Sequence, residues 1–380
     1  MKSLIRTGLA AAAVTAGAIA FAGSAGAAPF QFGFGGGDHA VFVQTDNPSG
    51  NQIVAYQRSG NGTLTPAGTY NTGGVGGILA GSAVDHTASQ GSLTYDTDNS
   101  QLYAVNAGSN TVSVFSVRGD QLSLRQVVSS GGTFPVSVAV HGNLVYVLNA
   151  ENGGSVQGYF ASSGRLSPLP GASRALGLDP TATPQFTNTP GQVAFSPNGS
   201  QLIVTTKANG NDIDVFGVGF SGNLSPTPVI NSEPGQVPFG VAFDAVGHLV
   251  VADTGSNSLA TYNLNRNGTV TELDDVGSTQ AATCWVAPVG RFFYTSNAGS
   301  ATVSGYQEAG FFGQLNLLGQ TNTDPGTVDA SASSDGQFLY VQTGGNGVVD
   351  EFQVHFNGSL TEVGSVTVPN SAGGEGIVAS

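Results

Sequence analysis

Short apolar stretches separated by turns rich in glycine and asparagine recur along almost the whole chain. Within the stretches, apolar and polar residues alternate, and valine, tyrosine and phenylalanine are frequent. A period of two residues is typical of β-strands with one buried face, and these residue types favour strands. Because a helical period is almost absent, the pattern predicts an all-β protein.

One motif repeats along the chain, a polar turn followed by an alternating strand that ends on an aromatic residue. It reads NAGSNTVSVF at 106–115, DTGSNSLATY at 253–262 and NAGSATVSGY at 297–306. The final aromatic residues, 44 to 59 positions apart, are Tyr56, Phe115, Tyr159, Phe216, Tyr262, Tyr306 and Phe352. Repeats of this length with four short strands each are typical of β-propeller blades. We therefore predict a seven-bladed β-propeller.

The two ends of the repeat region predict how the ring closes. Most repeats begin with an inner apolar strand, such as residues 192–195 or 240–243, but the first repeat lacks one. The C-terminus carries the spare strand at 376–379. We expect this C-terminal strand to complete the first blade, since closure removes open sheet edges.

Two gaps between repeats are longer than the others, and the extra residues fall at 73–89 and 171–189. Both segments are predicted to be loop insertions. Long loops on a rigid scaffold are frequent binding elements, and neutral surface decoration is the alternative. The first insertion contains Asp85 and His86, for which a role in acid–base chemistry is conceivable.

The N-terminus resembles a cleaved secretory signal. Lys2 and Arg6 precede an alanine-rich apolar stretch, and Ala25-Gly-Ala27 is a small-residue cleavage site. We predict a signal peptide at 1–27, a glycine-rich linker at 28–37, a propeller at 38–380 and a secreted mature protein. The alternative is an uncleaved membrane anchor, although the apolar stretch is short for a span. No later stretch is expected to span a bilayer as a helix.

The charge argues against two classes of partner. The chain has a formal charge of −14, and loss of the signal leaves eight basic against 24 acidic residues, or −16. A strongly acidic protein is a poor ligand for nucleic acid or anionic membranes. The only cysteine, Cys284, precludes an internal disulfide and is expected to be a buried thiol. A monomer is expected, because a closed ring has no free edge.

Few sequence motifs in this chain indicate a specific chemistry. No zinc pattern, phosphate-binding loop or nucleophile elbow is present, so we predict no metal and no cofactor. Asn-Gly-Thr/Ser sequences occur at 61, 198, 267 and 357 and match glycosylation acceptors. Their place in hairpins favours a second explanation, that Asn-Gly suits the positive φ angles of tight turns.

The central channel is the candidate ligand site, because the inner strands of all blades converge there. Alignment of the repeats places small or polar residues at its mouth: Ser92, Ser137, Gln192, Gly240, Thr283, Asp329 and Glu375. Lys207 follows a strand on the same side. Converging polar groups can bind a small molecule, whereas a water-filled channel also needs polar lining. Lys207 could hold a substrate carboxylate or be a solvated turn residue.

The repeats resemble the lactonase-type seven-bladed propellers, which include 6-phosphogluconolactonase-like and carboxymuconate-cyclase-like proteins. The similarity rests on PVSVAV at 135–140, PGQVAFSPNG at 190–199 and GGEGIVA at 373–379, and it covers about residues 38–380. It resembles a secreted bacterial branch of that family. Active members carry a histidine, an Arg-His pair and a glutamate where this chain has Ser137, Gly191-Gln192 and Lys207.

The resemblance therefore implies two functions. In the first, the protein is a lactonase-like hydrolase or cyclase for a small carboxylated or sugar-derived molecule, with Asp329 and Glu375 catalytic. Lys207, Gln192, Ser137, Ser92 and Thr283 would then bind the substrate. In the second, the propeller is a non-catalytic extracellular module that binds a ligand or a protein.

Overall fold

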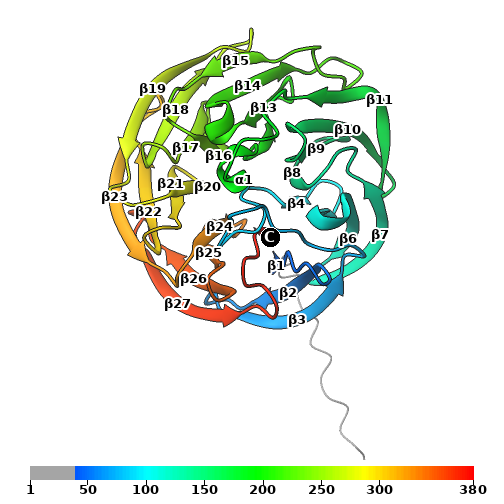
Figure 1. Cartoon of the computed structure of the whole chain (residues 1–380). Coiled ribbons are helices and arrows are strands. Elements are labelled where there is room, and N and C mark those ends of the chain that lie inside the picture. The colour runs from blue at the N-terminus through cyan, green and yellow to red at the C-terminus, as the bar shows by residue number, and fades with distance from the viewer. Residues whose placement is uncertain (1–38) are drawn as a thin grey trace, which may run out of the picture. The chain divides into compact units, whose positions relative to one another are not determined.

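A computed structural model describes residues 39–380, and in this part of the chain seven four-stranded antiparallel sheets form a ring (Figure 1). The prediction of an all-β, seven-bladed propeller is confirmed. The predicted signal peptide at 1–27 and linker at 28–37 lie outside the described residues. None of the described helices is long and apolar enough to cross a bilayer.

Each blade runs from an inner strand at the channel to an outer strand at the rim. Blade 1 contains β28 (Ile377–Ala379), β1 (Ala40–Gln44), β2 (Gln52–Arg58) and β3 (Leu64–Asn71). Blade 2 contains β4 (Leu93–Asp96), β5 (Gln101–Asn106), β6 (Thr111–Arg118) and β7 (Gln121–Ser129). Blade 3 contains β8 (Pro135–His141), β9 (Leu144–Asn149), β10 (Ser155–Ser162) and β11 (Arg165–Ala175). Blade 4 contains β12 (Val193–Phe195), β13 (Gln201–Thr205), β14 (Asp212–Gly217) and β15 (Val229–Ser232).

The last three blades repeat the same order. Blade 5 contains β16 (Pro238–Phe243), β17 (Leu249–Asp253), β18 (Ser258–Leu264) and β19 (Val270–Gly277). Blade 6 contains β20 (Thr283–Val289), β21 (Phe292–Asn297), β22 (Thr302–Glu308) and β23 (Leu315–Asn322). Blade 7 contains β24 (Thr327–Ala332), β25 (Phe338–Thr343), β26 (Val348–Val354) and β27 (Leu360–Thr367). The only α-helix in residues 39–380 is α1 (Gln185–Asn188).

The predicted closure by the C-terminal strand is confirmed. β28 pairs antiparallel with β1, with Val41 opposite Ala379 and Val43 opposite Ile377. The Gln44 amide N–H continues the ladder by donating to the Gly376 carbonyl at 2.8 Å. The first and last strands of the propeller therefore share one sheet, and β1 has no free edge.

The core consists of apolar layers between neighbouring blades. For example, Val41 and Tyr56 of blade 1 pack with Phe338 and Tyr340 of blade 7. Some tyrosines of the second strands also link blades through their hydroxyl groups. The Tyr146, Tyr294 and Tyr340 hydroxyls donate at 2.6 to 2.8 Å to the carbonyls of hairpin glycines Gly222, Gly358 and Gly62 of the next blade. The repeated aromatic positions therefore supply both apolar packing and links between blades.

The two insertions lie at one end of the channel. No strand interrupts residues 73–92, and their light-blue trace crosses the centre of the ring in Figure 1. The second insertion is shorter than predicted, because β11 continues to Ala175, and it includes α1. We call residues 73–92 the plug and the face that carries it the plug face.

Candidate functional site

The plug is a fixed part of the fold. The Gln90 side chain donates to the Val286 carbonyl at 2.9 Å and accepts from the Val286 N–H at 3.0 Å. The amide thus forms the same pair of hydrogen bonds that a residue of a neighbouring strand would form. The Trp285 indole N–H donates to the Ser89 carbonyl at 2.6 Å, and the Ser89 hydroxyl donates to the Val136 carbonyl at 2.8 Å. With these bonds to blades 3 and 6, the plug closes this end of the channel.

Asp85 stabilises the conformation of the plug. Its buried carboxylate accepts hydrogen bonds from the N–H groups of Thr87, Ala88 and Ser89 at 2.8 to 3.0 Å. Burial raises the pKa of Asp85 to about 6, although these hydrogen bonds and the charge of Lys207 act in the opposite direction. The three hydrogen bonds fix the backbone of residues 87–89 around this carboxyl group.

Lys207 joins the two insertions. Its ammonium group donates to the Ala88 carbonyl of the plug and the Phe186 carbonyl of the second insertion, both at 2.6 Å, and to the Thr189 hydroxyl at 3.2 Å. The residue is 1% exposed, so the interpretation of a solvated turn residue is wrong. Burial lowers the pKa of Lys207 to about 7, with the charge of Asp85 opposing the shift. All three ammonium protons are used by the protein.

Asp329 and Glu375 meet beneath the plug. Both side chains are buried at this position. Burial raises the pKa of Asp329 to about 7, and burial together with nearby carboxylates raises that of Glu375 well above its usual range. Glu375 also accepts from the Thr87 hydroxyl at 3.1 Å and the Gly91 N–H at 3.2 Å. The pair is thus brought together as the repeats suggested, but it faces the plug.

The remaining candidate residues of the inner strands bind neighbouring parts of the fold. The Ser92 hydroxyl donates to the Glu375 carbonyl at 2.8 Å, and the Thr283 hydroxyl donates to the Asn297 side chain at 2.7 Å. The Ser137 hydroxyl accepts from the Val193 N–H at 3.2 Å, and the Gln192 side chain accepts from the Val241 N–H at 2.6 Å. These four side chains therefore link adjacent blades or, for Thr283, two strands of one blade.

A pocket of about 300 Å³ opens beside the plug, and we call it the mouth pocket. Its lining is mainly apolar and comes from the plug, the second insertion and blades 4, 5 and 6. The lining residues are Gly81, Ser82, Ala83, Val84, Asp85, Ala88, Phe186, Thr187, Lys207, Val237, Phe239, Thr254, Ala282, Cys284, Trp285 and Ala298. Of the candidates predicted from the inner strands and Lys207, only Lys207 lines it.

Trp285 and Cys284 are adjacent residues of the pocket lining. Trp285 is 3% exposed and packs edge-on against Phe239, with ring centroids 5.0 Å apart. Cys284 is buried as expected, and burial raises the pKa of its thiol to about 12. Such a thiol is a poor nucleophile. Cys284 therefore contributes apolar surface to the pocket.

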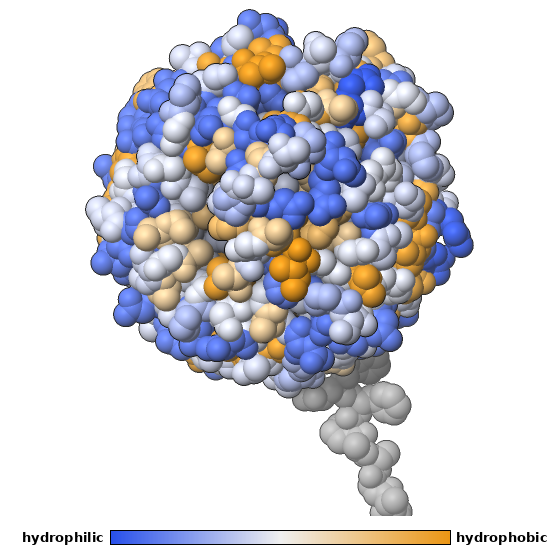
Figure 2. All heavy atoms as spheres, viewed as in Figure 1, coloured by the Kyte–Doolittle hydropathy of each residue, from blue (hydrophilic) through white to orange (hydrophobic). Residues whose placement is uncertain are grey.

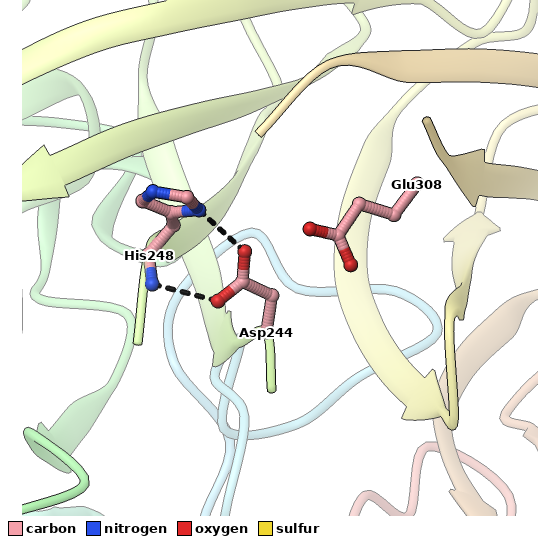
Figure 3. A group of neighbouring side chains, drawn as sticks. All are labelled: Asp244, His248 and Glu308. Carbon is pink, nitrogen blue, oxygen red and sulfur yellow. Dashed lines mark hydrogen bonds and ion pairs between the residues drawn. The ribbon is translucent and has the colours of Figure 1, made fainter. Parts of the chain in front are cut away.

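A second group of polar side chains lies at the far end of blade 5. Figure 3 shows Asp244 between His248 and Glu308, and ligand atoms of the three lie within 4.8 Å of one another. Asp244 accepts from the His248 ring at 2.5 Å and from three N–H groups of its own turn at 2.7 to 3.0 Å. Burial would raise the pKa of Asp244, but the His248 hydrogen bonds lower it. As an ion pair, Asp244 and His248 stabilise this turn.

Comparisons with known proteins agree with the fold. Residues 50–172 match the family model described as lactonase, seven-bladed β-propeller. The periplasmic gluconolactonase of Pseudomonas aeruginosa has a similar structure, with a TM-score of 0.72 and 18% identity over 89% of this chain and 98% of that one. A proposed 6-phosphogluconolactonase from Bacteroides fragilis has a TM-score of 0.69 and 18% identity over 88% and 96% of the two chains.

These identities are low, so the structural similarity establishes the fold and not the activity. No curated protein sequence matches this chain significantly. The family match covers parts of blades 1 to 3, and the structure supplies the remaining blades of the same ring. The chain is therefore a seven-bladed β-propeller, and residues 50–172 of it match the lactonase family model.

Proposed function

We propose that this protein binds a small, mainly apolar molecule in the mouth pocket, and that lactones with a hydrocarbon substituent belong to its ligand class. The observation that carries the proposal is the pocket itself, about 300 Å³ in volume and lined by Val84, Phe186, Phe239 and Trp285 among other apolar residues. Concave, mainly apolar pockets with a few polar groups are typical of small-molecule sites.

The lining argues against a phosphorylated sugar as the ligand. Lys207 is the only cationic residue among the lining residues, and its three protons already bind Ala88, Phe186 and Thr189. A phosphate group would enter without a free ammonium or guanidinium partner, and burying such a charge unpaired is costly. An ester carbonyl is neutral and needs only one hydrogen-bond donor.

Binding can be measured through Trp285, the only tryptophan of the chain. We expect δ-nonalactone to change Trp285 fluorescence with a saturable dependence on concentration, and the polar gluconolactone to have no such effect. Ala298→Phe places a ring inside the pocket and should weaken binding about tenfold or more, a loss of ~1.4 kcal/mol.

The matched control for this variant is Ala309→Phe in an exposed turn of blade 6, which should bind like the parent protein. Equal affinities of the Ala298→Phe variant and the parent protein would show that the ligand lies elsewhere. A preference for gluconolactone would contradict the proposed apolar ligand class.

Hydrolysis of the bound lactone is a second candidate function, favoured by the match to the lactonase family and by Asp85 in the pocket lining. An ionised Asp85 would take a proton from a water molecule while the oxygen of that water attacks the carbonyl carbon of the lactone. The ring C–O bond would then break, and the proton would pass to the ring oxygen. The positive charge of Lys207 would favour the negatively charged intermediate.

A pH-stat assay of lactone hydrolysis distinguishes two candidate catalytic sites, Asp85 and the buried pair of Asp329 and Glu375. If Asp85 is the base, Asp85→Asn should lower turnover about 100-fold or more, the range typical of a lost general base. Asp98→Asn, at an exposed turn, is the control and should retain full turnover. Loss confined to Glu375→Gln would assign the reaction to the buried pair. No turnover in the parent protein would leave binding as the function.

A further inference from the structure

We propose that the cleft between blades 2 and 3, on the face opposite the plug, binds a neutral sugar unit. The cleft has a volume of about 350 Å³. Its lining residues are Asn99, Gln101, Tyr103, Asn143, Ala161, Ser162, Ser163 and Gly164. Most carry amide or hydroxyl groups, and none is charged. This chemistry suits a polyhydroxylated, uncharged ligand.

The blade 3 hairpin beside the cleft is shorter than those of blades 1, 4 and 7. In blades 1, 4 and 7, the third-strand aromatic and the leucine after the hairpin are eight positions apart. Tyr159 and Leu166 of blade 3 are seven apart, as are Phe115 and Leu122 of blade 2. The blade 3 turn consists of Ser163 and Gly164, with φ angles of 51° and 73°. Two residues with positive φ make a tight hairpin.

The shorter hairpin leaves Tyr103 without the partner that its counterparts have. Tyr103 occupies the third position of β5, as Tyr146, Tyr294 and Tyr340 do in β9, β21 and β25. Those three hydroxyls donate to hairpin glycines of the next blade. Within residues 39–380 no hydrogen bond joins Tyr103 to Gly164, although both line the cleft. The hydroxyl is therefore available to a ligand.

One further polar atom, next to the cleft, has no partner. The Gln101 side-chain oxygen is buried and has no donor among the described residues. This Gln101 oxygen lies beside Gly164, and a Cβ atom added to Gly164 would be 3.3 Å from the oxygen. The hairpin covers this oxygen, so a ligand would pair with the amide and hydroxyl groups that line the cleft, the Tyr103 hydroxyl among them. These groups offer both acceptors and donors to a sugar.

The corresponding cleft between blades 6 and 7 provides an internal comparison. It is lined by Tyr294, Gly358 and Gln320 among others, and has a volume of about 370 Å³. There the tyrosine hydroxyl donates to the Gly358 carbonyl at 2.8 Å. Two clefts of similar size thus differ in whether the tyrosine is already paired, which makes Tyr294 the natural control for Tyr103.

Saturation-transfer NMR with methyl glucoside, methyl galactoside and methyl mannoside tests the proposal. We expect at least one glycoside to bind, and Tyr103→Phe to weaken binding about fivefold or more, since one hydrogen bond is lost. Tyr294→Phe should leave glycoside binding unchanged and lower the melting temperature. Tyr103→Phe should not lower it, because that hydroxyl has no partner within the protein.

A second variant tests the role of the hairpin. Inserting one asparagine before Gly164 gives the hairpin the length found in blades 1, 4 and 7, so it should abolish glycoside binding and leave the fold intact. The proposal is overturned if no glycoside binds or if Tyr103→Phe binds them normally. It is also overturned if Tyr103→Phe destabilises the protein as Tyr294→Phe does. Trp285 fluorescence should not respond to the glycosides, which distinguishes this site from the mouth pocket.

Discussion

The melting temperature should fall as the pH rises from 5 to 8, by about 5–10 °C. The cause is a set of buried carboxyl groups that keep their protons in the folded protein. Burial raises their pKa values to about 6 for Asp85 and Asp350, about 7 for Asp214 and Asp329, and about 8 for Asp46.

The sign follows from the protons bound in each state. In the unfolded chain these groups ionise near their ordinary pKa values of about 4, so between pH 4 and 8 the folded state holds more protons. Their contribution is fully present below the unfolded pKa and is lost as the pH rises through the folded values. Lys207, with a pKa lowered to about 7, acts in the opposite direction, but only between about pH 7 and 10.5.

Melting curves in buffers of equal ionic strength measure this effect. A double variant, Asp329→Asn with Glu375→Gln, removes Asp329 and its neighbour Glu375, whose pKa burial also raises, and should flatten the curve without abolishing folding. Asp98→Asn, an exposed substitution, should leave the slope unchanged. A melting temperature that is constant or that rises between pH 5 and 8 would show that these carboxyl groups are ionised in the folded protein.

The ring was predictable because its signals are local and repeated. A strand that ends on an aromatic residue such as Phe115 or Tyr306 can be recognised from its own alternation of apolar and polar residues. Because the pattern occurs seven times, irregularities in one copy do not hide the repeat. The spare strand at 376–379 was also recognisable, because the first repeat lacked an inner strand. Lengthened gaps located the insertions, although periodicity could not show that residues 73–92 cross the channel.

The site was less predictable because its contacts join distant segments. Lys207 binds Ala88, which is 119 positions away, and no spacing rule predicts that pair. A lysine in a turn is usually solvated, so its burial could not be read from the sequence. The polar inner-strand residues were correctly placed near the channel, but Ser137 and Gln192 are engaged by neighbouring strands. The unpaired Tyr103, in contrast, is reflected in the sequence by a blade 3 hairpin one residue shorter than those of blades 1, 4 and 7.

Removing residues 374–380 should have the largest effect on stability of any short deletion. The deletion takes away β28, so β1 loses its partner strand and Val41, Phe42 and Val43 gain exposed surface. The loss of several ladder hydrogen bonds and of the buried Ile377 side chain should lower the free energy of unfolding by on the order of 5 kcal/mol. A free edge of this kind also favours association between chains.

Urea unfolding and size-exclusion chromatography measure both consequences, and a peptide of residues 374–380 supplies the decisive control. If β28 acts by completing the blade, the peptide should raise the melting temperature of the truncated protein toward the parent value, whereas a scrambled peptide should not. Full-length Glu375→Gln separates the loss of that carboxyl group from the loss of the strand, and it should retain most of the stability. A truncated protein that melts at the parent temperature would contradict the closure argument, since the first blade would then be stable with three strands.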